Sequence, residues 1–310
     1  MLGIGDDAAA WQPSRSHLSV ITTDALVDRV HFDSARMTAR EIGHRAMAAN
    51  LSDIAAMGAR PILVTVALAL AGESEAWVEQ LYGGMQALAA RYGTRIAGGD
   101  LVRAPVLALS LTVVGEVART RLRRRDRGRA GDVLAVTGPL GASRAGLELE
   151  RRDLALPEET LAAARRSFRT PEPRVAEGRR LAASRYVHAM MDCSDGLSTD
   201  LARIAAASGL GATIESVPVA PCAEEIARAC GADPRAWALH GGEDFELIVA
   251  VAPRAFPHLA ARYRSHFGRE LLPFGKLVAG EGVRDVAGEA IPAGGYDHFK
   301  ELAGTKKSRA

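Results

Sequence analysis

The stretch AREIGHRAMAANLSDIAAMGARPILVTVALAL, residues 39–70, holds both kinds of segment from which the chain is built. Its first part, Ala39–Ala56, carries apolar residues at helical spacing. Its second part, Pro61–Leu70, is an apolar run of strand length. Because this run is apolar on both faces of the strand that it forms, both faces need protein cover. We therefore predict a fold that mixes helices with a covered sheet.

The same two patterns recur on either side of this stretch. Further strands are predicted at His17–Thr22, Thr94–Ala97, Val106–Val117, Val133–Thr137, His188–Met191 and Glu246–Val251. Further helices are predicted at Glu75–Tyr92, Glu158–Phe168, Pro173–Ala183, with Pro173 in the first turn, and Ser198–Ala207. The order does not alternate strand and helix cleanly enough for a doubly wound parallel sheet, so the predicted class is α+β.

A run of arginines marks the sharpest change in composition. Seven arginines fall within the eleven residues Arg119–Arg129, and the turn signal Ala130-Gly131-Asp132 follows. We predict a domain boundary here, with an N-terminal domain at 1–132 and a C-terminal domain at 133–310. The run itself has three readings: a solvated segment between domains, a segment that carries a phosphate-contacting arginine, or a nucleic-acid patch, which the near-neutral total charge disfavours.

Composition narrows the classes of partner. The 310 residues have a formal net charge of only +2, which gives no reason to expect nucleic acid or an anionic membrane as partner. The first residues do not resemble a signal peptide, and the longest apolar run, Pro61–Ala71, is far short of the ~20 residues that span a bilayer. Three cysteines without a CxxC pair favour reduced thiols in the cytoplasm.

Acidic residues gather in turns at the ends of the predicted strands and in one helix. The motifs are GIGDD (3–7), TTD (22–24), NLSD (50–53), GGD (98–100), DCSDG (192–196) and GGED (241–244). Any one of them is typical of a turn or a helix cap. Carboxylates that converge on one spot repel one another unless a cation lies between them. Oxygen ligands without a His/Cys set indicate Mg²⁺, which proteins usually bind together with substrate phosphates.

Several familiar phosphate-binding patterns are absent from the sequence. There is no GxxxxGK[ST] loop and no HRD plus DFG set. If the chain handles ATP, we expect it to grip the phosphates mainly through metal ions.

The motifs together resemble the thiamine-monophosphate kinase family. The matching segments are GIGDDAA (3–9), TTDALV with HF (22–32), NLSDIAAMGA with Pro61 (50–61), GGD (98–100), VTGPLG (136–141), MDCSDGL (191–197), GGEDFEL (241–247) and GYDHF (295–299). They agree with the family in order and spacing over nearly the whole chain. The resemblance implies two α/β domains of the aminoimidazole ribonucleotide synthetase-like type and a homodimer formed through the N-terminal sheet. It also implies transfer of the γ-phosphoryl group of ATP to thiamine monophosphate, giving thiamine diphosphate.

The resemblance also carries residue roles over to this chain. The catalytic residues implied are Asp24, Asp53, Asp100 and Arg125. The Mg²⁺ ligands implied are Asp7, Thr22, Thr23, Asp24, Asp53, Asp100, Asp192 and Asp195. The ATP contacts implied are Gly99, Asp100, Arg125 and Ser194, and the thiamine-side contacts are His31, Glu243 and Tyr296. Taken alone, His31 and Tyr296 are also compatible with ordinary packing roles.

The chain departs from the family pattern after GGD. The family typically reads TTRGP there, whereas this sequence reads LVRAP at 101–105, which removes two hydroxyls beside the expected site. Two alternatives to the kinase stay open. One is another ATP-dependent enzyme of the superfamily, although selenophosphate synthesis would need a cysteine near the N-terminus and none precedes Cys193. The other is a non-catalytic regulator that binds ATP or thiamine phosphate.

Overall fold

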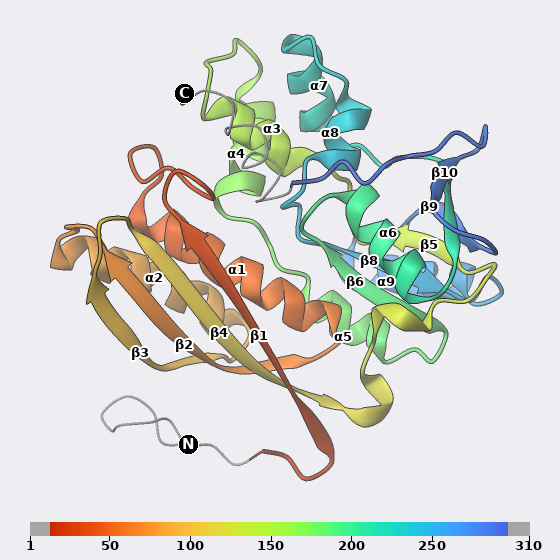
Figure 1. Ribbon diagram of the computed structural model, residues 1–310, viewed down its shortest axis with the longest axis horizontal. Helices are drawn as coiled ribbons and strands as arrows, with labels where there is room; N and C mark the ends of the chain where they lie inside the picture. Colours follow the sequence, from red (N-terminus) through yellow and green to blue (C-terminus); the bar gives the residue numbers. More distant parts are fainter. Residues whose placement is uncertain (1–12, 297–310) are drawn as a thin grey trace, which may run out of the picture.

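Two β-sheets organise the protein, whose computed structural model describes residues 13–296 (Figure 1). The first sheet has four strands in the order β1-β4-β2-β3, and the second has six in the order β10-β7-β9-β5-β8-β6. Sheet and helix are mixed in both parts of the chain, which confirms the predicted α+β class.

The four-stranded sheet is built from long strands. They are β1 (His17–Val27), β2 (Arg60–Leu70), β3 (Arg95–Arg103) and β4 (Ala108–Ala118). Strand β4 pairs antiparallel with both β1 and β2, and β2 pairs parallel with β3. Helices α1 (Ala39–Ala56) and α2 (Glu75–Arg91) cover one face of this sheet (Figure 1). Among residues 13–296, no helix covers the opposite face, which we call the outer face.

Helix α1 is buried nearly all round because protein packs on every side of it. Thr38 caps its first turn in a capping box with Glu41. The helix contacts α2, the four-stranded sheet, and elements of the second part of the chain, including α5 and β6. Small residues permit this close packing: a Cβ on Gly43 would lie 2.0 Å from the carbonyl oxygen of Leu81. A helix that is buried on all sides fixes whatever polar side chains it carries.

The second part of the chain surrounds the six-stranded sheet. Its strands are β5 (Val133–Val136), β6 (Val187–Cys193), β7 (Gly211–Ile214), β8 (Glu246–Val251), β9 (Leu272–Val278) and β10 (Val283–Asp285). Its helices are α3 (Ala142–Leu149), α4 (Glu158–Arg169), α5 (Val175–Ala182), α6 (Leu197–Ala207), α7 (Pro221–Ala229), α8 (Pro234–His240) and α9 (Phe256–Phe267). Two short 3₁₀ helices, η1 (Arg119–Arg121) and η2 (Arg125–Arg127), lie in the arginine run.

Strand β8 joins the two main apolar cores. Leu247, Val249 and Val251 belong to the core that includes α1 and Tyr263 of α9. Ile248 and Ala250 belong to the core under α6. Every residue of the strand is buried, as expected for a strand covered on both faces.

Strands β7, β9 and β10 were not predicted, and several predicted boundaries differ from those observed. Three of these differences bear on the expected site or on a predicted turn. Strand β1 continues to Val27, so Asp24 lies within the strand and not after it. Strand β3 runs through Gly98, Gly99 and Asp100, which we had placed in a turn after the strand. Helix α5 begins only at Val175. Pro173 precedes the helix, and its carbonyl accepts a hydrogen bond from the Tyr92 hydroxyl.

No helix in the described part of the chain has the length and apolar character needed to cross a bilayer.

Candidate active site

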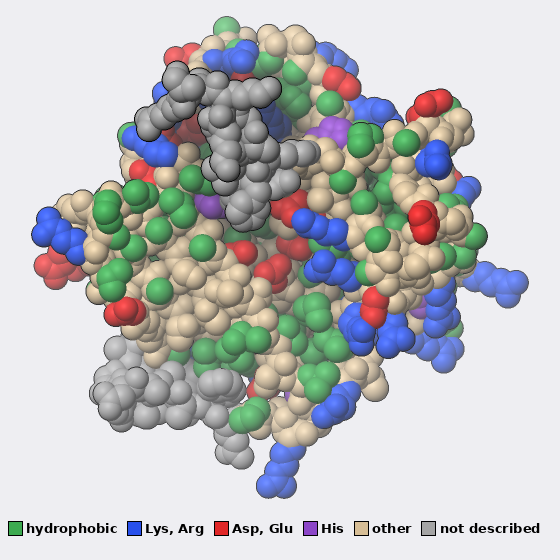
Figure 2. All heavy atoms as spheres, in the orientation of Figure 1, with side chains coloured by type: hydrophobic (Ala, Val, Ile, Leu, Met, Phe, Trp, Pro, Cys, Tyr) green, Lys and Arg blue, Asp and Glu red, His purple; other side chains and the backbone are tan. Residues whose placement is uncertain are grey.

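A cavity of about 910 Å³ is lined by residues of both parts of the chain. Its walls come from β1, α1, the turn between β6 and α6, and the loop before β8. Figure 2 shows acidic side chains gathered in the central hollow of the visible face, with basic side chains beside them. The sequence-predicted residues that line this cavity are Asp24, His31, Asp53, Asp192, Ser194, Asp195, Glu243 and Tyr296.

Strand β1 and helix α1 place the first two carboxylates. Asp24 lies on the face of the sheet that packs on α1, and its backbone N–H donates to Asn50 Oδ1 at 3.1 Å. One turn further along α1, Asp53 Oδ2 accepts a hydrogen bond from Thr22 Oγ1 at 2.5 Å. The hydrogen bonds that join β1 to α1 therefore involve the same segments that carry Asp24 and Asp53.

The carboxylates lie within one another's electrostatic field. The pKa of Asp24 is raised to about 6. Burial is the largest cause, and the charges of Asp53 and Asp195 contribute the rest. Burial also raises the pKa of Asp53, while the Thr22 hydrogen bond and the charge of Arg125 act in the opposite direction. Such a set favours either protonation or a bound cation.

Asp192 lies within the last part of β6, which was expected to end at Met191, and Asp195 lies in the turn after this strand. Burial raises the pKa of Asp192 well above its usual value, and the charge of Asp53 adds to the increase. Its Oδ2 accepts a hydrogen bond from Ser52 Oγ of α1 at 2.9 Å. Asp195 forms an ion pair with Arg203 of α6, so this carboxylate already has a cationic partner.

The loop GGEDFE, residues 241–246, forms the opposite wall of the cavity. Glu243 and Phe245 have φ values of +58° and +51°, a region that side-chain-bearing residues rarely adopt. Backbone hydrogen bonds hold them there: Glu243 N–H donates to the Ser194 carbonyl at 2.7 Å, and Phe245 N–H donates to the Cys193 carbonyl at 3.1 Å. The loop before β8 and the turn after β6 therefore form one connected frame.

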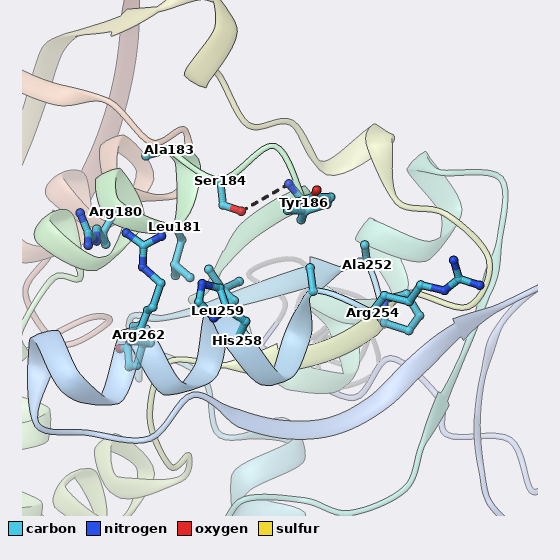
Figure 3. A pocket seen from close by; sticks show the side chains of 13 residues that line it. Arg180, Leu181, Ala183, Ser184, Tyr186, Ala252, Arg254, His258, Leu259 and Arg262 are labelled. Carbon is cyan, nitrogen blue, oxygen red and sulfur yellow. Dashed lines mark hydrogen bonds between the residues drawn. The ribbon is translucent and has the colours of Figure 1, made fainter.

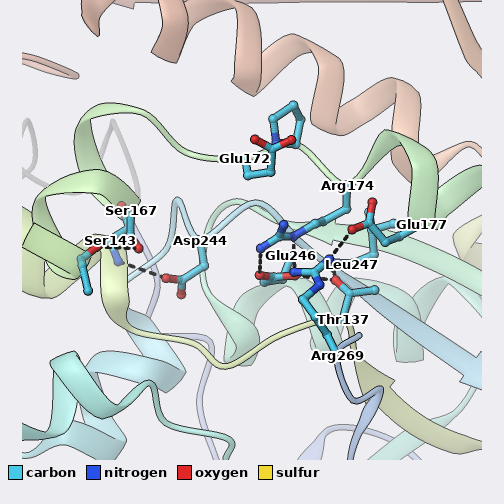
Figure 4. Close-up of polar contacts among 12 residues, drawn as sticks. Thr137, Ser143, Ser167, Glu172, Arg174, Glu177, Asp244, Glu246, Leu247 and Arg269 are labelled. Atoms are coloured by element: carbon cyan, nitrogen blue, oxygen red, sulfur yellow. Dashed lines mark hydrogen bonds and ion pairs between the residues drawn. The ribbon is translucent and has the colours of Figure 1, made fainter. Parts of the chain in front are cut away.

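Each carboxylate of this loop has its own partner. Glu243 lies 2.5 Å from Arg45 of α1. Asp244 accepts from the backbone N–H groups of Gly141 and Ser143 at the start of α3, at 2.8 and 3.1 Å, and burial raises its pKa to about 7. Glu246 accepts from Arg174 and, at 2.6 Å, from the Thr137 hydroxyl (Figure 4). Of the three, Glu243 is the one that lines the cavity.

The remaining predicted residues lie elsewhere. Thr23 faces the outer side of the sheet, and its hydroxyl donates to the Leu111 carbonyl at 3.0 Å. Arg125 lies in η2, outside the cavity lining, although its charge acts on Asp53. Thr22 contributes through its bond to Asp53. Asp7 lies outside the described residues.

Asp100 and Gly99 are at the far edge of the sheet from Asp24. Asp100 pairs with Ala67 of β2, whose side chain is exposed on the outer face, whereas Asp24 pairs with the buried Leu111. Three strand spacings separate β1 from β3, roughly 14 Å. A single chain therefore does not bring Asp100 together with Asp24 and Asp53. In the part of the chain that the structure describes, no group of three or more His, Cys, Asp or Glu side chains is arranged to hold a metal ion.

Sequence reasoning missed Arg45 and Arg174, which support the loop 241–246. Nothing in their local sequence marks them, because their partners lie far along the chain.

A second cavity, of about 850 Å³, lies between α5 and α9 (Figure 3). Apolar side chains such as Leu181 and Leu259 line it together with Arg180, Arg254 and Arg262. It contains none of the predicted site residues and no carboxylate. The acidic cavity is therefore the candidate active site.

Comparison with known protein families agrees with this fold and site. The family model of the AIR synthase related protein N-terminal domain matches residues 5–117, and that of the C-terminal domain matches residues 129–267. These two matches assign the chain to the class of AIR synthase related proteins. The two sheets and the acidic cavity described above are the fold and the site of this member of the class.

Individual relatives narrow the class. The chain is 38% identical to the thiamine-monophosphate kinase of Rhodopirellula baltica over 293 residues, 91% of this chain and 85% of the relative. The crystal structure of thiamine-monophosphate kinase from Stenotrophomonas maltophilia K279a matches with a TM-score of 0.86 at 38% identity, covering 94% of this chain and 92% of that one. A structure of AaThiL complexed with AMPPCP and TMP matches with a TM-score of 0.81 at 28% identity, covering 94% and 90%. The chain belongs to the thiamine-monophosphate kinase family.

Proposed function

We propose that the protein transfers the γ-phosphoryl group of ATP to thiamine monophosphate and releases thiamine diphosphate. The observation that carries this proposal is the acidic cavity, where the predicted phosphate-side residues Asp24, Asp53 and Ser194 lie with the predicted thiamine-side residues Glu243 and Tyr296. The related AaThiL, solved in complex with AMPPCP and TMP, supports the same pair of ligands.

We propose Mg²⁺ as the cation of this site. The fit rests on the donor set: buried carboxylates that raise one another's pKa are oxygen ligands in need of a positive charge. The described side chains do not form a complete metal site by themselves, so Asp24, Asp53 and Asp192 would hold the metal together with oxygens of the substrate phosphates. When bound, Mg²⁺ neutralises and orients phosphate oxygens. Arg125 would add a fixed positive charge near Asp53.

The protein need not supply a general base for this reaction. The acceptor is a phosphate monoester, whose second pKa is about 6, so its oxygen is already largely ionised near neutral pH. The residues would instead bind and align two anionic groups for direct in-line transfer. Two consequences follow: the rate should rise through about pH 6 and then level off, and thiamine without its phosphate should be a very poor acceptor.

The direct experiment is incubation of the purified protein with ATP, Mg²⁺ and thiamine monophosphate, followed by identification of the product by mass. We expect thiamine diphosphate and ADP. Absence of thiamine diphosphate would overturn the proposed activity. A ³²P-labelled protein formed with ATP alone, or efficient phosphorylation of free thiamine, would overturn the direct mechanism.

We further propose a homodimer formed through the outer face of the four-stranded sheet. Ile21 of β1 is 70% exposed there, and Val102 of β3, two residues after Asp100, is 50% exposed on the same face. Asp100 lies on this face too. A second protomer packed on it would allow Asp100 of one chain to serve the site of the other.

This arrangement predicts complementation between inactive variants. In a mixed dimer of Asp53→Asn and Asp100→Asn chains, one site would combine both defects and the other would have neither. Mixing the two inactive proteins under subunit exchange should therefore restore part of the activity. If Asp100 acted within its own chain, every site of the mixed dimer would carry one defect and no activity would return.

We propose a cytoplasmic location. Cys193, Cys222 and Cys230 are free thiols, and the first two are buried. Unpaired cysteines support a reducing compartment.

A further inference from the structure

Arg45 is a fully buried cation at the centre of the molecule. It lies on α1, and only 1% of its side chain is exposed. A buried charge costs several kcal/mol unless partners compensate it. Its Nη1 donates to the Phe168 carbonyl, and its guanidinium lies over the Phe168 ring at 4.3 Å from the centroid. These contacts anchor one side of the guanidinium group.

The other side of the guanidinium faces Glu243. Arg45 Nη2 lies 2.5 Å from Glu243 Oε1, and this is the one ion pair that the described part of the chain provides for Arg45. Nε is buried and has no hydrogen-bond acceptor among the described residues, and Nη2 has no partner there besides Glu243 Oε1. The charge of Arg45 is therefore committed to a single carboxylate, which belongs to the cavity wall.

Glu243 is held in place from two directions. Its backbone has a φ of +58° and is tied to the Ser194 carbonyl at 2.7 Å. Its side chain remains 36% exposed toward the cavity, while Oε1 faces Arg45. Arg45 thus occupies one carboxylate oxygen, and Oε2 remains to accept a hydrogen bond from a ligand.

We propose that Arg45 is a positioning residue that fixes Glu243, so that its second oxygen stays directed into the cavity and accepts a hydrogen bond from the acceptor substrate. This inference rests on the proposed function, because it takes the acceptor to bind beside Glu243. Arg45 itself does not touch the reacting phosphates. Lysine cannot replace it fully, because one ammonium cannot reproduce a planar fork that contacts Phe168 and Glu243 together.

The test compares Arg45→Met, Arg45→Lys, Glu243→Gln and the double variant Arg45→Met/Glu243→Gln. The control is Arg91→Met, which removes another Arg–Glu pair, Arg91–Glu172 at 2.6 Å, that lies outside the cavity. KM for thiamine monophosphate and for ATP are measured separately, together with kcat. We expect Arg45→Met to raise KM for thiamine monophosphate about tenfold or more, while KM for ATP stays within about twofold. Arg45→Lys should be intermediate, and Arg91→Met should match the wild type.

The double variant decides whether Arg45 acts through Glu243. If it does, the double variant should be no worse than Glu243→Gln alone. Additive effects, or equal increases in both KM values, would overturn the inference. If Arg45→Met does not fold, Arg45→Lys decides, and a wild-type KM for thiamine monophosphate in that variant overturns it. If the wild-type protein shows no turnover, the proposed function is wrong. If the wild type is active and Arg45→Met has the wild-type KM for thiamine monophosphate, only the positioning role of Arg45 is wrong.

Discussion

At the scale of single residues, the main feature is a set of carboxylates whose charges oppose one another. Asp24 and Asp53 lie half-buried within reach of each other's charge, and the pKa of each is raised. The hydrogen bond from Thr22 and the charge of Arg125 partly counteract the rise in the pKa of Asp53. A site of this kind favours ligand binding over the stability of the empty fold.

The first prediction concerns Asp53→Asn. Turnover at saturating Mg²⁺ should fall by about 100-fold or more, because a charged ligand is lost. The fold should survive, and in the absence of metal the free energy of unfolding should be unchanged or higher by up to ~1 kcal/mol, since repulsion is relieved. Steady-state kinetics and urea denaturation with EDTA measure both effects. Full activity in the variant would exclude Asp53 as a ligand.

The second prediction concerns the pH dependence contributed by Asp244. Its pKa is about 7 in the folded protein because of burial, above the ordinary value near 3.8. The stability that it contributes is therefore fully present below about pH 4 and is lost as the pH rises through about 7. The difference in unfolding free energy between wild type and Asp244→Asn should decrease from pH 4.5 to 7.5, by ~1 kcal/mol or more. Urea denaturation at several pH values measures it; an increase over this range would contradict the assignment.

Sequence patterns identified the carboxylates of the site but not the arginines that pair with Glu243 and Glu246. TTD and NLSD are recognisable because each is a local cluster of polar residues beside an apolar run. Arg45 and Arg174 gain their roles only from Glu243 and Glu246, which the fold brings to them. Local sequence contains no information on such a pairing, so only the tertiary structure reveals it.

At the scale of elements, α1 and α2 pack unusually closely. A Cβ on Gly84 would lie 2.0 Å from the Arg40 carbonyl oxygen, a rigid backbone atom. A Cβ on the neighbouring Gly83 would meet only the end of the Arg40 side chain, at 3.1 Å. Gly84 is therefore required by close contact with the backbone of α1, whereas a side chain at Gly83 would meet only a flexible arginine side chain.

This contrast gives the third prediction. Gly84→Ala should destabilise the protein by ~1–3 kcal/mol, because the two helices must separate. Gly83→Ala should be neutral or stabilising by up to ~1 kcal/mol, because alanine is the better helix former. Thermal or urea unfolding of the two variants measures the difference. Equal effects would show that the helix contact is not as close as described.

The fourth prediction concerns the support of β8. Arg174 binds Glu246 with two hydrogen bonds, and Glu246 also holds Thr137. Arg174→Met should cost ~3–5 kcal/mol, because it leaves a buried carboxylate without its cation. Urea denaturation measures this loss, and a cost below ~1 kcal/mol would show that Glu246 finds another partner.

Elements with a strong apolar pattern were predicted, whereas short or less regular ones were missed, and so were the twelve-residue helix α9 and the seven-residue strand β9. Helix α1 and strand β8 agree with the predicted bounds because their apolar patterns are strong. Strand β7 has four residues, too few to display a period, and it was missed. Strand β3 was predicted too short because its two glycines suggest a turn, whereas Gly99 in fact lets β3 approach Val66 of β2.

At the scale of the whole molecule, the two faces of the four-stranded sheet differ in their cover. Helices α1 and α2 pack on one face, whereas the outer face leaves Ile21 70% exposed and Val102 50% exposed. Such a surface is typical of an interface.

The fifth prediction tests this interface. Ile21→Asp should convert a dimer to a monomer, because it places a charge within the proposed apolar contact. The matched control is Val286→Asp, since Val286 is 72% exposed but lies beyond β10. Light scattering at micromolar concentration gives the mass of each. A wild-type monomer, or a dimer that persists in Ile21→Asp, would exclude this face.

The frame formed by the turn after β6 and the loop before β8 has a thermodynamic consequence. Ser194 and Asp195 lie on the proposed nucleotide side, and Glu243 lies on the acceptor side, yet one backbone hydrogen bond of 2.7 Å joins the two segments. Whichever substrate arrives first would order the frame for the second and so lower its dissociation constant. Linkage then requires that the factor by which the nucleotide tightens acceptor binding equal the factor by which the acceptor tightens nucleotide binding.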